Sequence, residues 1–424
     1  MLVLSVFLGA LLFFSLAGLP IGFAIGLTTM VLMFVLGMPD AMVLARRMIS
    51  GVDVYTLLAI PFFMLAGEFM NKAGLVRDIL LFANAIMGRI RGGLAYVNVV
   101  ASMLFAGISG SAVADAAALG SLEMPMMERS GYDREFSAAI TAASSVIGPI
   151  IPPSIPMIIL GSIGQISISK LFLGGAVPGL LIGVALMGVC WVMARKRSYP
   201  SGERVSFREF LRILSKTVWA LILPLIILGG VLGGIFTATE AGAVAVVYAC
   251  IISYTVYGVK FDAYPAIFRA AALNTGVVML VCATAMALTW YLAVGQVPQL
   301  LTNFITGVTS DRIVFLLIMN IVLFLVGMFI DLTPSLFLLV PILLPVSRAY
   351  GIDPVHFGVI MVANLCVGLI TPPVGTVLYV TNSIAKISLG QLVRELLPMY
   401  LVLFVVVLLI TYVPFLVLWL PSFV

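Results

Sequence analysis

Charged side chains are scarce in this chain. Asp, Glu, Lys and Arg make up 9% of its 424 residues, whereas hydrophobic residues make up 63%. The mean hydropathy is +1.25. This composition is not that of a soluble domain of this length, and apolar stretches of about 20 residues, enough to cross a bilayer, recur throughout. We therefore expect a protein that crosses the membrane many times, and its net charge of +5 is no sign of nucleic-acid binding.

Histidine and cysteine are also rare. His356 is the one histidine, and the four cysteines, Cys190, Cys250, Cys282 and Cys366, are widely separated. No pair of cysteines has the CxxC spacing of a zinc site, and the spacing does not support a disulfide framework. These absences argue against a histidine-based metal site and against a histidine proton relay.

A run of prolines, in contrast, lies in the middle of an apolar stretch, as Gly148-Pro149-Ile150-Ile151-Pro152-Pro153. Each proline inside a helix removes a backbone donor and clashes with the preceding turn, which costs about 3 kcal/mol. Carbonyl groups freed in this way find no water in the hydrocarbon core. We therefore expect a span broken at its centre rather than a simple kink, as in secondary transporters.

The same pattern recurs 220 residues later, which indicates a duplication. The matched residues are prolines, glycines and one aspartate, whose positions matter most to the backbone. The pairs are Gly107 and Gly327, Pro125 and Pro345, Gly131 and Gly351, Asp133 and Asp353, Gly148 and Gly368, Pro152-Pro153 and Pro372-Pro373, and Pro178 and Pro398.

The sequence therefore predicts an all-α polytopic membrane protein built from two inverted repeats. The repeats are 1–196 and 217–424, joined by a basic linker at 197–216. Each has five membrane-crossing helices and one re-entrant hairpin, with a broken helix at the midplane. The hairpins and broken helices are expected, in chain order, at 94–128, 136–160, 313–348 and 356–382.

Basic residues predict the orientation. Seven of them lie close together, at Arg195, Lys196, Arg197, Arg204, Arg208, Arg212 and Lys216. Such a cluster marks a cytoplasmic segment. With five crossings in each half, both termini are expected outside. Of the 22 basic residues, 17 then fall inside and 5 outside.

The two breaks predict two similar cation sites. Helix C-terminal ends offer carbonyl groups that suit a bare cation, and N-terminal ends suit an anion. Oxygen ligands without thiols or imidazoles fit sodium. The candidates for site 1 are Ser109, Ser111, Gly148, Ile151 and Pro153, and those for site 2 are Gly327, Asp331, Thr333, Gly368, Thr371 and Pro373.

Several helix ends are expected at these breaks. Thr333 and Thr371 each precede a proline, as an N-cap followed by proline at the first helical position does. Ser109 and Ser111 are expected to cap hairpin 1 in the same way. Gly148 and Gly368 are expected to end the preceding half-helices.

Other polar residues in the apolar segments allow two interpretations. Ser144, Ser145 and Asn364 lie one turn before the breaks and either face a substrate or form hydrogen bonds between helices. Five carboxyl groups are candidates for proton coupling or for plain helix-start charges: Glu68, Asp115, Glu123, Glu240 and Asp331. For Glu240 the helix-start interpretation is favoured.

Three other kinds of protein remain as alternatives. An ion channel also uses re-entrant loops, and a proton-coupled anion transporter would share the architecture. An intramembrane aspartyl protease would use Asp115 and Asp331 as a pair. Neither aspartate lies in a Gly-x-Gly-Asp setting, and the repeat aligns Asp331 with Ser111.

Three motifs resemble one family. They are Ser109-Gly110-Ser111-Ala112-Val113-Ala114-Asp115, Ile151-Pro152-Pro153-Ser154-Ile155-Pro156-Met157-Ile158 and Thr237-Ala238-Thr239-Glu240-Ala241-Gly242-Ala243. The chain is similar over essentially its whole length to the large membrane (M) subunit of tripartite ATP-independent periplasmic (TRAP) transporters. In the third motif Ala238 stands where the family usually has proline.

The resemblance implies a function. Members import organic acids, such as C4-dicarboxylates or sialic acid, across the bacterial inner membrane, driven by Na+. Their partners are a small membrane (Q) subunit and a periplasmic substrate-binding (P) protein. The resemblance also implies an elevator mechanism, in which a block at about 94–194 and 312–392 moves against the rest as scaffold. No enzymatic activity and no organic cofactor are implied.

Overall fold

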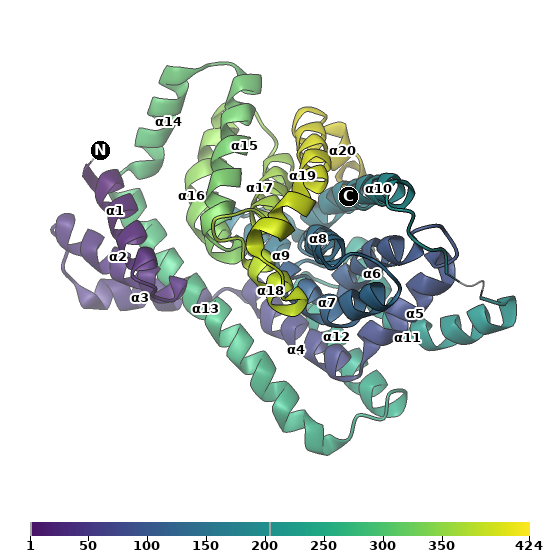
Figure 1. Cartoon of the computed structure of the whole chain (residues 1–424). Helices are drawn as coiled ribbons and strands as arrows, with labels where there is room; N and C mark the ends of the chain where they lie inside the picture. Colours follow the sequence, from purple (N-terminus) through teal and green to yellow (C-terminus); the bar gives the residue numbers. More distant parts are fainter. Residues whose placement is uncertain (1, 203–204) are drawn as a thin grey trace.

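The computed structural model describes residues 2–202 and 205–424, and these form helices without any named strand (Figure 1). The α-helices are α1 (Leu2–Leu16), α2 (Ile21–Val35), α3 (Ala41–Val52), α4 (Ala59–Lys72), α5 (Leu75–Met87), α6 (Gly93–Ser109), α7 (Ala112–Arg129), α8 (Arg134–Ser145), α9 (Ile155–Gly164), α10 (Ile168–Lys196), α11 (Phe207–Leu232), α12 (Ala238–Thr255), α13 (Tyr264–Val294), α14 (Val297–Val308), α15 (Arg312–Phe329), α16 (Leu332–Ala349), α17 (Pro354–Gly368), α18 (Thr376–Ala385), α19 (Leu389–Tyr412) and α20 (Phe415–Leu418). Three 3₁₀ helices are η1 (Tyr55–Leu58), η2 (Phe261–Ala263) and η3 (Leu420–Phe423).

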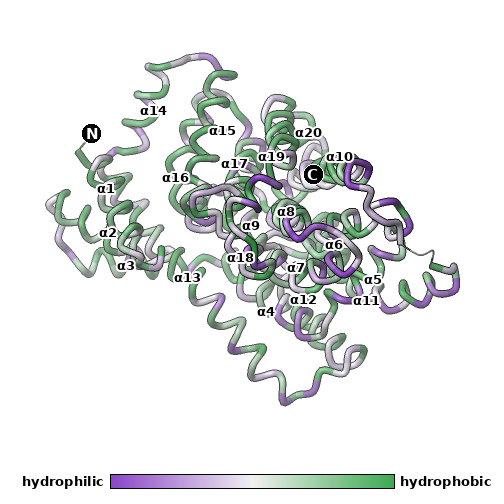
Figure 2. Tube along the Cα trace, viewed as in Figure 1, coloured by the Kyte–Doolittle hydropathy of each residue, from purple (hydrophilic) through white to green (hydrophobic). Residues whose placement is uncertain are grey.

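Seven helices within the described ranges are long and apolar enough to cross a membrane: α10, α11, α12, α13, α15, α16 and α19. The segment from α3 to α4 is an eighth candidate, bent by 61° at the short break between them. Figure 2 shows hydrophobic residues along most helices and hydrophilic residues in turns and at helix ends. The chain is therefore a helical polytopic membrane protein.

Two helical hairpins are each followed by an interrupted helix. Hairpin 1 is α6–α7, followed by α8, a break at 146–154 and α9. Hairpin 2 is α15–α16, followed by α17, a break at 369–375 and α18. Helix α16 lies 220 residues after α7, and the Pro152-Pro153 and Pro372-Pro373 peptide bonds are both cis.

The two hairpin units interlock. Helix α7 packs against α8 of its own unit and against α18 of the other, and α16 packs against α17 and against α9. These helices gather in the centre of Figure 1. Around them α4 packs against α12 and α13, and α13 also contacts α2 and α3, which form the outer arm at the left of the view.

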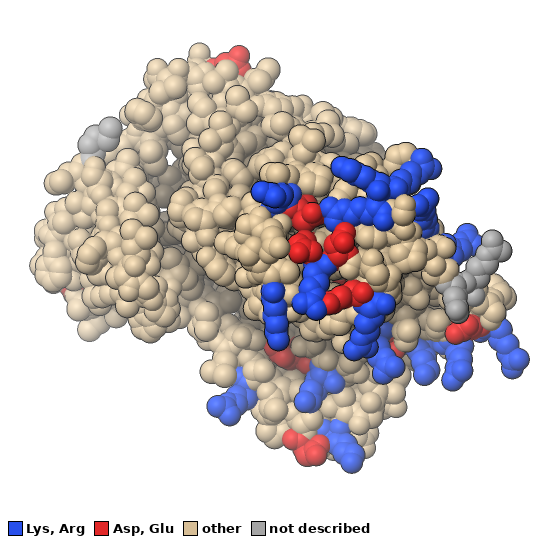
Figure 3. All heavy atoms as spheres, in the orientation of Figure 1, with Lys and Arg blue, Asp and Glu red and all other residues tan. Residues whose placement is uncertain are grey.

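The basic stretch differs from a plain linker. Ser206 accepts a hydrogen bond from the Glu209 N–H at 3.3 Å and caps α11, which therefore begins at Phe207, inside the segment predicted as linker. Its first turns carry Arg208, Arg212 and Lys216, whereas Arg204 lies outside the described residues. Figure 3 shows Lys and Arg gathered over the right and lower part of this face, the side of α5 and α11.

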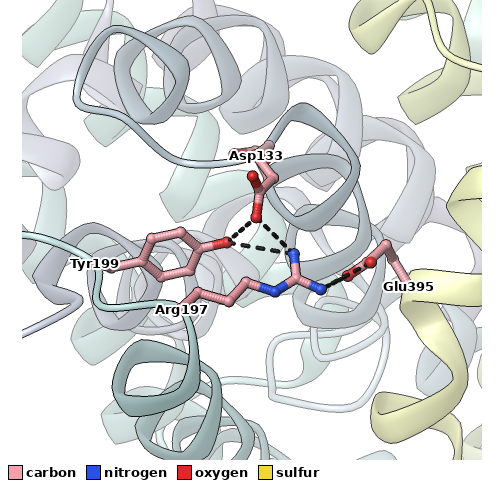
Figure 4. Close-up of polar contacts among 5 residues, drawn as sticks. Asp133, Arg197, Tyr199 and Glu395 are labelled. Atoms are coloured by element: carbon pink, nitrogen blue, oxygen red, sulfur yellow. Dashed lines mark hydrogen bonds and ion pairs between the residues drawn. The ribbon is translucent and has the colours of Figure 1, made fainter.

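A polar cluster ties the end of α10 to the rest of the hairpin region (Figure 4). The Arg197 guanidinium donates to both carboxylate oxygens of Glu395 at 2.8 and 2.7 Å, and to Asp133 Oδ2 at 2.7 Å. The Tyr199 hydroxyl donates to the same Asp133 oxygen at 2.7 Å. The Tyr199 hydroxyl and the Arg197 guanidinium hold the pKa of Asp133 below its ordinary value.

Candidate functional site

An open cavity of about 640 Å³ lies where the hairpins, the breaks and two outer helices meet. It is lined from both hairpin tips, from the region of both breaks, and from α4 and α13. Among its lining residues are Ser109, Gly110, Ser111, Pro149, Asp331, Thr333, Leu369, Thr376, Glu68, Asn71 and Asn274. The predicted convergence of hairpins and breaks is therefore present in the fold.

The tip of hairpin 1 touches the first break through backbone atoms. Gly110 has φ 58°, and a Cβ there would lie 3.3 Å from the Pro153 carbonyl oxygen. The Ser111 hydroxyl accepts from the Ala114 N–H at 3.4 Å and caps α7, as predicted. Ser109, Ser111 and the Pro153 carbonyl thus lie around one point.

Asp115 lies beside this point and is fully buried. One of its oxygens accepts from the Ser109 hydroxyl, and among the described residues the other, Oδ2, has no hydrogen-bond partner. A Cβ on Gly148 would lie 2.3 Å from that oxygen, so Gly148 leaves it room. A cation would satisfy it. The sequence analysis missed Asp115 as a ligand, although it ends the Ser109–Asp115 motif.

The helix ends at the first break differ from expectation. Helix α8 ends at Ser145, so Gly148 lies in the turns that follow instead of ending the helix. The Ile151 side chain packs on Gly179 of α10, where a Cβ would lie 2.3 Å from Ile151 Cγ1. The cap of α9 is Ser154, which accepts from the Met157 N–H at 3.2 Å and was not predicted.

Hairpin 2 contacts the second break in a similar way. A Cβ on Gly368 would lie 2.4 Å from the Gly327 carbonyl carbon, so the two backbones touch. The Val374 and Gly375 N–H groups donate to the Met328 carbonyl at 3.2 and 3.3 Å. Gly368 ends α17, as predicted.

Both threonine caps were predicted wrongly. Helix α16 begins at Leu332 with Asp331 as its N-cap, so Thr333 already lies in the first turn. Asp331 takes the N-cap position two residues before Thr333, although its side chain makes no capping hydrogen bond. The Thr371 hydroxyl donates to the Val367 carbonyl at 2.8 Å, four residues back, and does not cap α18.

Around the second break, two of the predicted site residues accept hydrogen bonds from side-chain hydroxyl groups. Asp331 accepts from the Thr376 hydroxyl at 3.0 Å, a link between hairpin 2 and α18. The Pro373 carbonyl accepts from the Tyr379 hydroxyl at 3.3 Å. Asp331 and Thr333 line the cavity, whereas Thr371 and Pro373 are not among its lining residues.

The three possible substrate-facing residues do not line the cavity. The Ser144 hydroxyl donates to Asn98 Oδ1 on α6 at 2.7 Å, and the Asn364 amide donates to Asn320 Oδ1 on α15 at 2.6 Å. Ser145 donates to the Ala142 carbonyl of its own helix at 2.8 Å. In this conformation Ser144 and Asn364 thus form hydrogen bonds between helices.

Glu240 takes the helix-start role that was favoured for it. The Thr237 hydroxyl accepts from the Glu240 N–H at 3.2 Å, and Glu240 Oε2 accepts from the Thr237 N–H at 2.8 Å. This capping box forms with Ala238 at the first helical position. Glu123 is buried in hairpin 1 and accepts from the Asn98 amide.

The outer side of the cavity is also polar. The Asn274 amide of α13 donates to Glu68 Oε1 of α4 at 3.0 Å. A smaller pocket of about 320 Å³ shares Glu68 and Asn71 with the cavity and is also lined by Lys72 and by α13 near Ala266. The described residues that line the main cavity include no lysine or arginine.

Fold and site define a helical membrane protein in which two hairpins and two interrupted helices meet at a cavity lined by apolar and polar residues. The family model described as "Tripartite ATP-independent periplasmic transporter, DctM component" matches residues 8–416. The chain belongs to this family and is a large permease subunit. It is therefore a transporter component and not an enzyme, which removes the protease alternative.

Individual proteins support this assignment. The chain is 44% identical to the uncharacterized protein YgiK of Salmonella typhimurium, covering 96% of this chain and 94% of that protein. It is 40% identical to the sialic acid TRAP transporter large permease protein SiaM of Vibrio cholerae (96% and 95% covered). It is 42% identical to the C4-dicarboxylate TRAP transporter large permease protein DctM of Pseudomonas aeruginosa (89% of each).

A solved structure has a similar fold. The crystal structure of the YdaH transporter of Alcanivorax borkumensis matches with a TM-score of 0.59 at 16% sequence identity. The match covers 84% of this chain and 86% of that chain. At this identity the likeness concerns the fold alone.

Proposed function

We propose that this large permease subunit imports an organic acid across the bacterial inner membrane, coupled to sodium. The observation that carries the proposal is the cavity, in which two hairpin tips and two helix breaks meet α4 and α13. Helix N-termini and hydroxyl groups suit a carboxylate, and the buried oxygens beside them suit cations. Because the described lining has no lysine or arginine, binding of the anion depends on the helix N-termini and hydroxyl groups and on the bound cations.

Two sodium sites are proposed. Site 1 uses Ser109, Ser111 and the backbone near Gly148 and Pro153, with Asp115 added because its second oxygen lacks a donor. Site 2 uses Asp331 and backbone oxygens of the second break. Binding of Na+ at both would place positive charge beside the carboxylate, which couples the two solutes.

The movement is proposed to be of the elevator type in two inverted repeats with outward-facing termini. The transport block is 94–194 with 312–392, held together by the interlocking of α7 with α18 and of α9 with α16. The scaffold includes α4, α12 and α13. The smaller pocket leads from the cavity toward Lys72, on the side predicted as cytoplasmic, so this conformation is taken to be inward-facing.

The partners are proposed from the family. A small membrane subunit would complete the scaffold, and a periplasmic binding protein would deliver the acid. The names of SiaM and DctM give sialic acid and C4-dicarboxylates as substrates of those proteins. A substrate from one of these two classes is proposed here.

Uptake into proteoliposomes tests the proposal. The large and small subunits are reconstituted together and supplied with a binding protein, labelled acid and an inward sodium gradient. Accumulation above the external concentration that collapses with a sodium ionophore is expected. Accumulation driven by a proton gradient alone would support proton coupling instead, and flux that only equilibrates the acid would support a channel.

A further inference from the structure

We infer that the cavity prefers hydroxylated monocarboxylates, such as sugar acids, over dicarboxylates, and that Glu68 sets this preference. The inference rests on the proposed function, because it requires that the acid passes through this cavity. It chooses between the two substrate classes left open above.

The two carboxylates that line the cavity, Asp331 and Glu68, differ in the groups that offset their negative charge. Asp331 lies at the N-terminus of α16, where the helix dipole favours a negative charge, and accepts from the Thr376 hydroxyl. Glu68 lies within α4, away from any helix N-terminus, and forms no ion pair with another described residue. Lys72, one turn further along α4, lines the adjoining pocket and not the main cavity. Glu68 therefore leaves a negative charge on the scaffold side.

The hydrogen-bonding groups on this side favour donors from a ligand. The Asn274 amide already donates to Glu68 Oε1 at 3.0 Å. Glu68 Oε2 and Asn274 Oδ1 remain as acceptors, and the Asn71 side chain lines the same wall. The Glu68 carboxylate binds hydroxyl or N–H groups and repels a second carboxylate, whereas the neutral amides of Asn71 and Asn274 can both accept from hydroxyl groups and donate to them.

The tip of hairpin 1 supplies the end of the cavity that suits the carboxylate of the ligand. Ser111 caps α7, a helix of 18 residues whose N-terminus opens into the cavity. The dipole and free N–H groups there suit one carboxylate. The volume of about 640 Å³ admits a six-carbon acid, and Phe63, Met64 and Val277 supply apolar contacts for its carbon chain.

Glu68 would then weaken the binding of an acid that carries a second carboxylate. A monocarboxylate places its charge at the hairpin tip and its hydroxyl groups against Glu68 and Asn274. A dicarboxylate of the same length brings its second charge next to Glu68. Repulsion between two partly buried charges at close range is enough to weaken binding by about tenfold or more.

The test compares six-carbon acids that differ in one group. Purified complex of the large and small subunits is titrated, with NaCl and without binding protein, with D-gluconate, D-glucarate and hexanoate. Calorimetry gives each affinity. Glucarate adds a second carboxylate to the gluconate skeleton, and hexanoate removes the hydroxyl groups. The variants are Glu68→Gln and Asn274→Asp, with Glu209→Gln as the control for loss of a carboxylate from a scaffold helix outside the cavity.

Wild type is expected to bind gluconate at least about tenfold more tightly than glucarate and more tightly than hexanoate. Glu68→Gln should reduce the gluconate-to-glucarate ratio about tenfold, and Asn274→Asp, which adds a negative charge, should raise it. Glu209→Gln should leave it unchanged. Equal affinities for gluconate and glucarate in the wild type, or a ratio that neither cavity variant moves, would overturn the inference. If none of the three acids binds in sodium, the inference is overturned, whereas the proposed function is decided separately by the uptake experiment with binding protein.

Discussion

Single hydroxyl and carboxyl groups at the hairpin tips carry the proposed ion coupling. Ser111 both caps α7 and lies at site 1, beside the buried pair of Ser109 and Asp115. In the second hairpin the order is reversed, because Asp331 stands at the cap and Ser335 stands four residues later. Each hairpin thus brings one carboxylate and at least one hydroxyl group to its first turn.

Replacing Ser111 with alanine should raise the sodium concentration that gives half-maximal uptake. Loss of one oxygen ligand and of the cap costs about 1 kcal/mol, which corresponds to roughly fivefold in affinity. Uptake into proteoliposomes at graded sodium concentrations measures this. Ser121→Ala is the control, because Ser121 lies on the same helix and donates only to the Ala118 carbonyl. An unchanged sodium dependence would remove Ser111 from the site.

Replacing Gly368 with alanine should destabilise the protein. The added Cβ would meet the Gly327 carbonyl carbon at 2.4 Å, and a backbone atom cannot swing aside as a side chain can. We expect a loss of about 1–3 kcal/mol, as for an overpacked core. Thermal unfolding in detergent measures it, with Gly188→Ala on α10 as control, since nothing lies within 4 Å there. Equal stability of the two variants would show that α15 and α17 approach less closely than described.

At the scale of helices, the sequence was most informative where proline and glycine restrict the backbone conformation. Proline and glycine positions indicated that the apolar segments at 136–160 and 356–382 are interrupted, and α16 starts and ends 220 residues after α7. Caps were harder, because Asp331 and Thr333 are both good capping residues and only packing chooses between them. Asp115 could not be assigned, since its value as a ligand depends on a missing hydrogen-bond donor, a property of the fold.

The connection after α10 gives an element-scale prediction. Because the pKa of Asp133 is lower in the folded state than in the unfolded state, its ion pair stabilises fully above the unfolded pKa, and this stabilisation is lost as the pH falls through the folded pKa. Asp133→Asn should therefore lower the unfolding temperature at pH 7, and the difference from wild type should shrink toward pH 3.

Thermal unfolding across that pH range checks the connection, with Asp262→Asn, on the exposed 3₁₀ helix η2, as the control. A difference between wild type and Asp133→Asn that stays constant down to pH 3 would contradict the role of the charge. The partner Arg197 contacts both Asp133 and Glu395, so the cluster joins the start of α8, inside the proposed transport block, to α19 at a residue just beyond the block's boundary at 392.

At the scale of the whole molecule, elevator transport requires the transport block to slide against the scaffold around the cavity. Helix α4 crosses hairpin 1 near its tip, where a Cβ on Gly67 would lie 3.7 Å from the Ile108 carbonyl oxygen. Few other contacts link α4 to the interlocked helices, whereas α4 packs extensively on α12 and α13. The elevator proposal therefore predicts that this contact is broken when the block moves.

Crosslinking that contact tests directly whether transport requires movement of the hairpins against α4. A variant that combines Gly67→Cys with Ile108→Cys, in a background without the four native cysteines, is treated with a short reversible thiol crosslinker in proteoliposomes. We predict that crosslinking abolishes sodium-driven uptake, that reduction restores it, and that the yield of crosslinked protein changes with sodium and substrate. Full crosslinking with undiminished uptake, or a yield independent of both ligands, would contradict movement of the hairpins against α4.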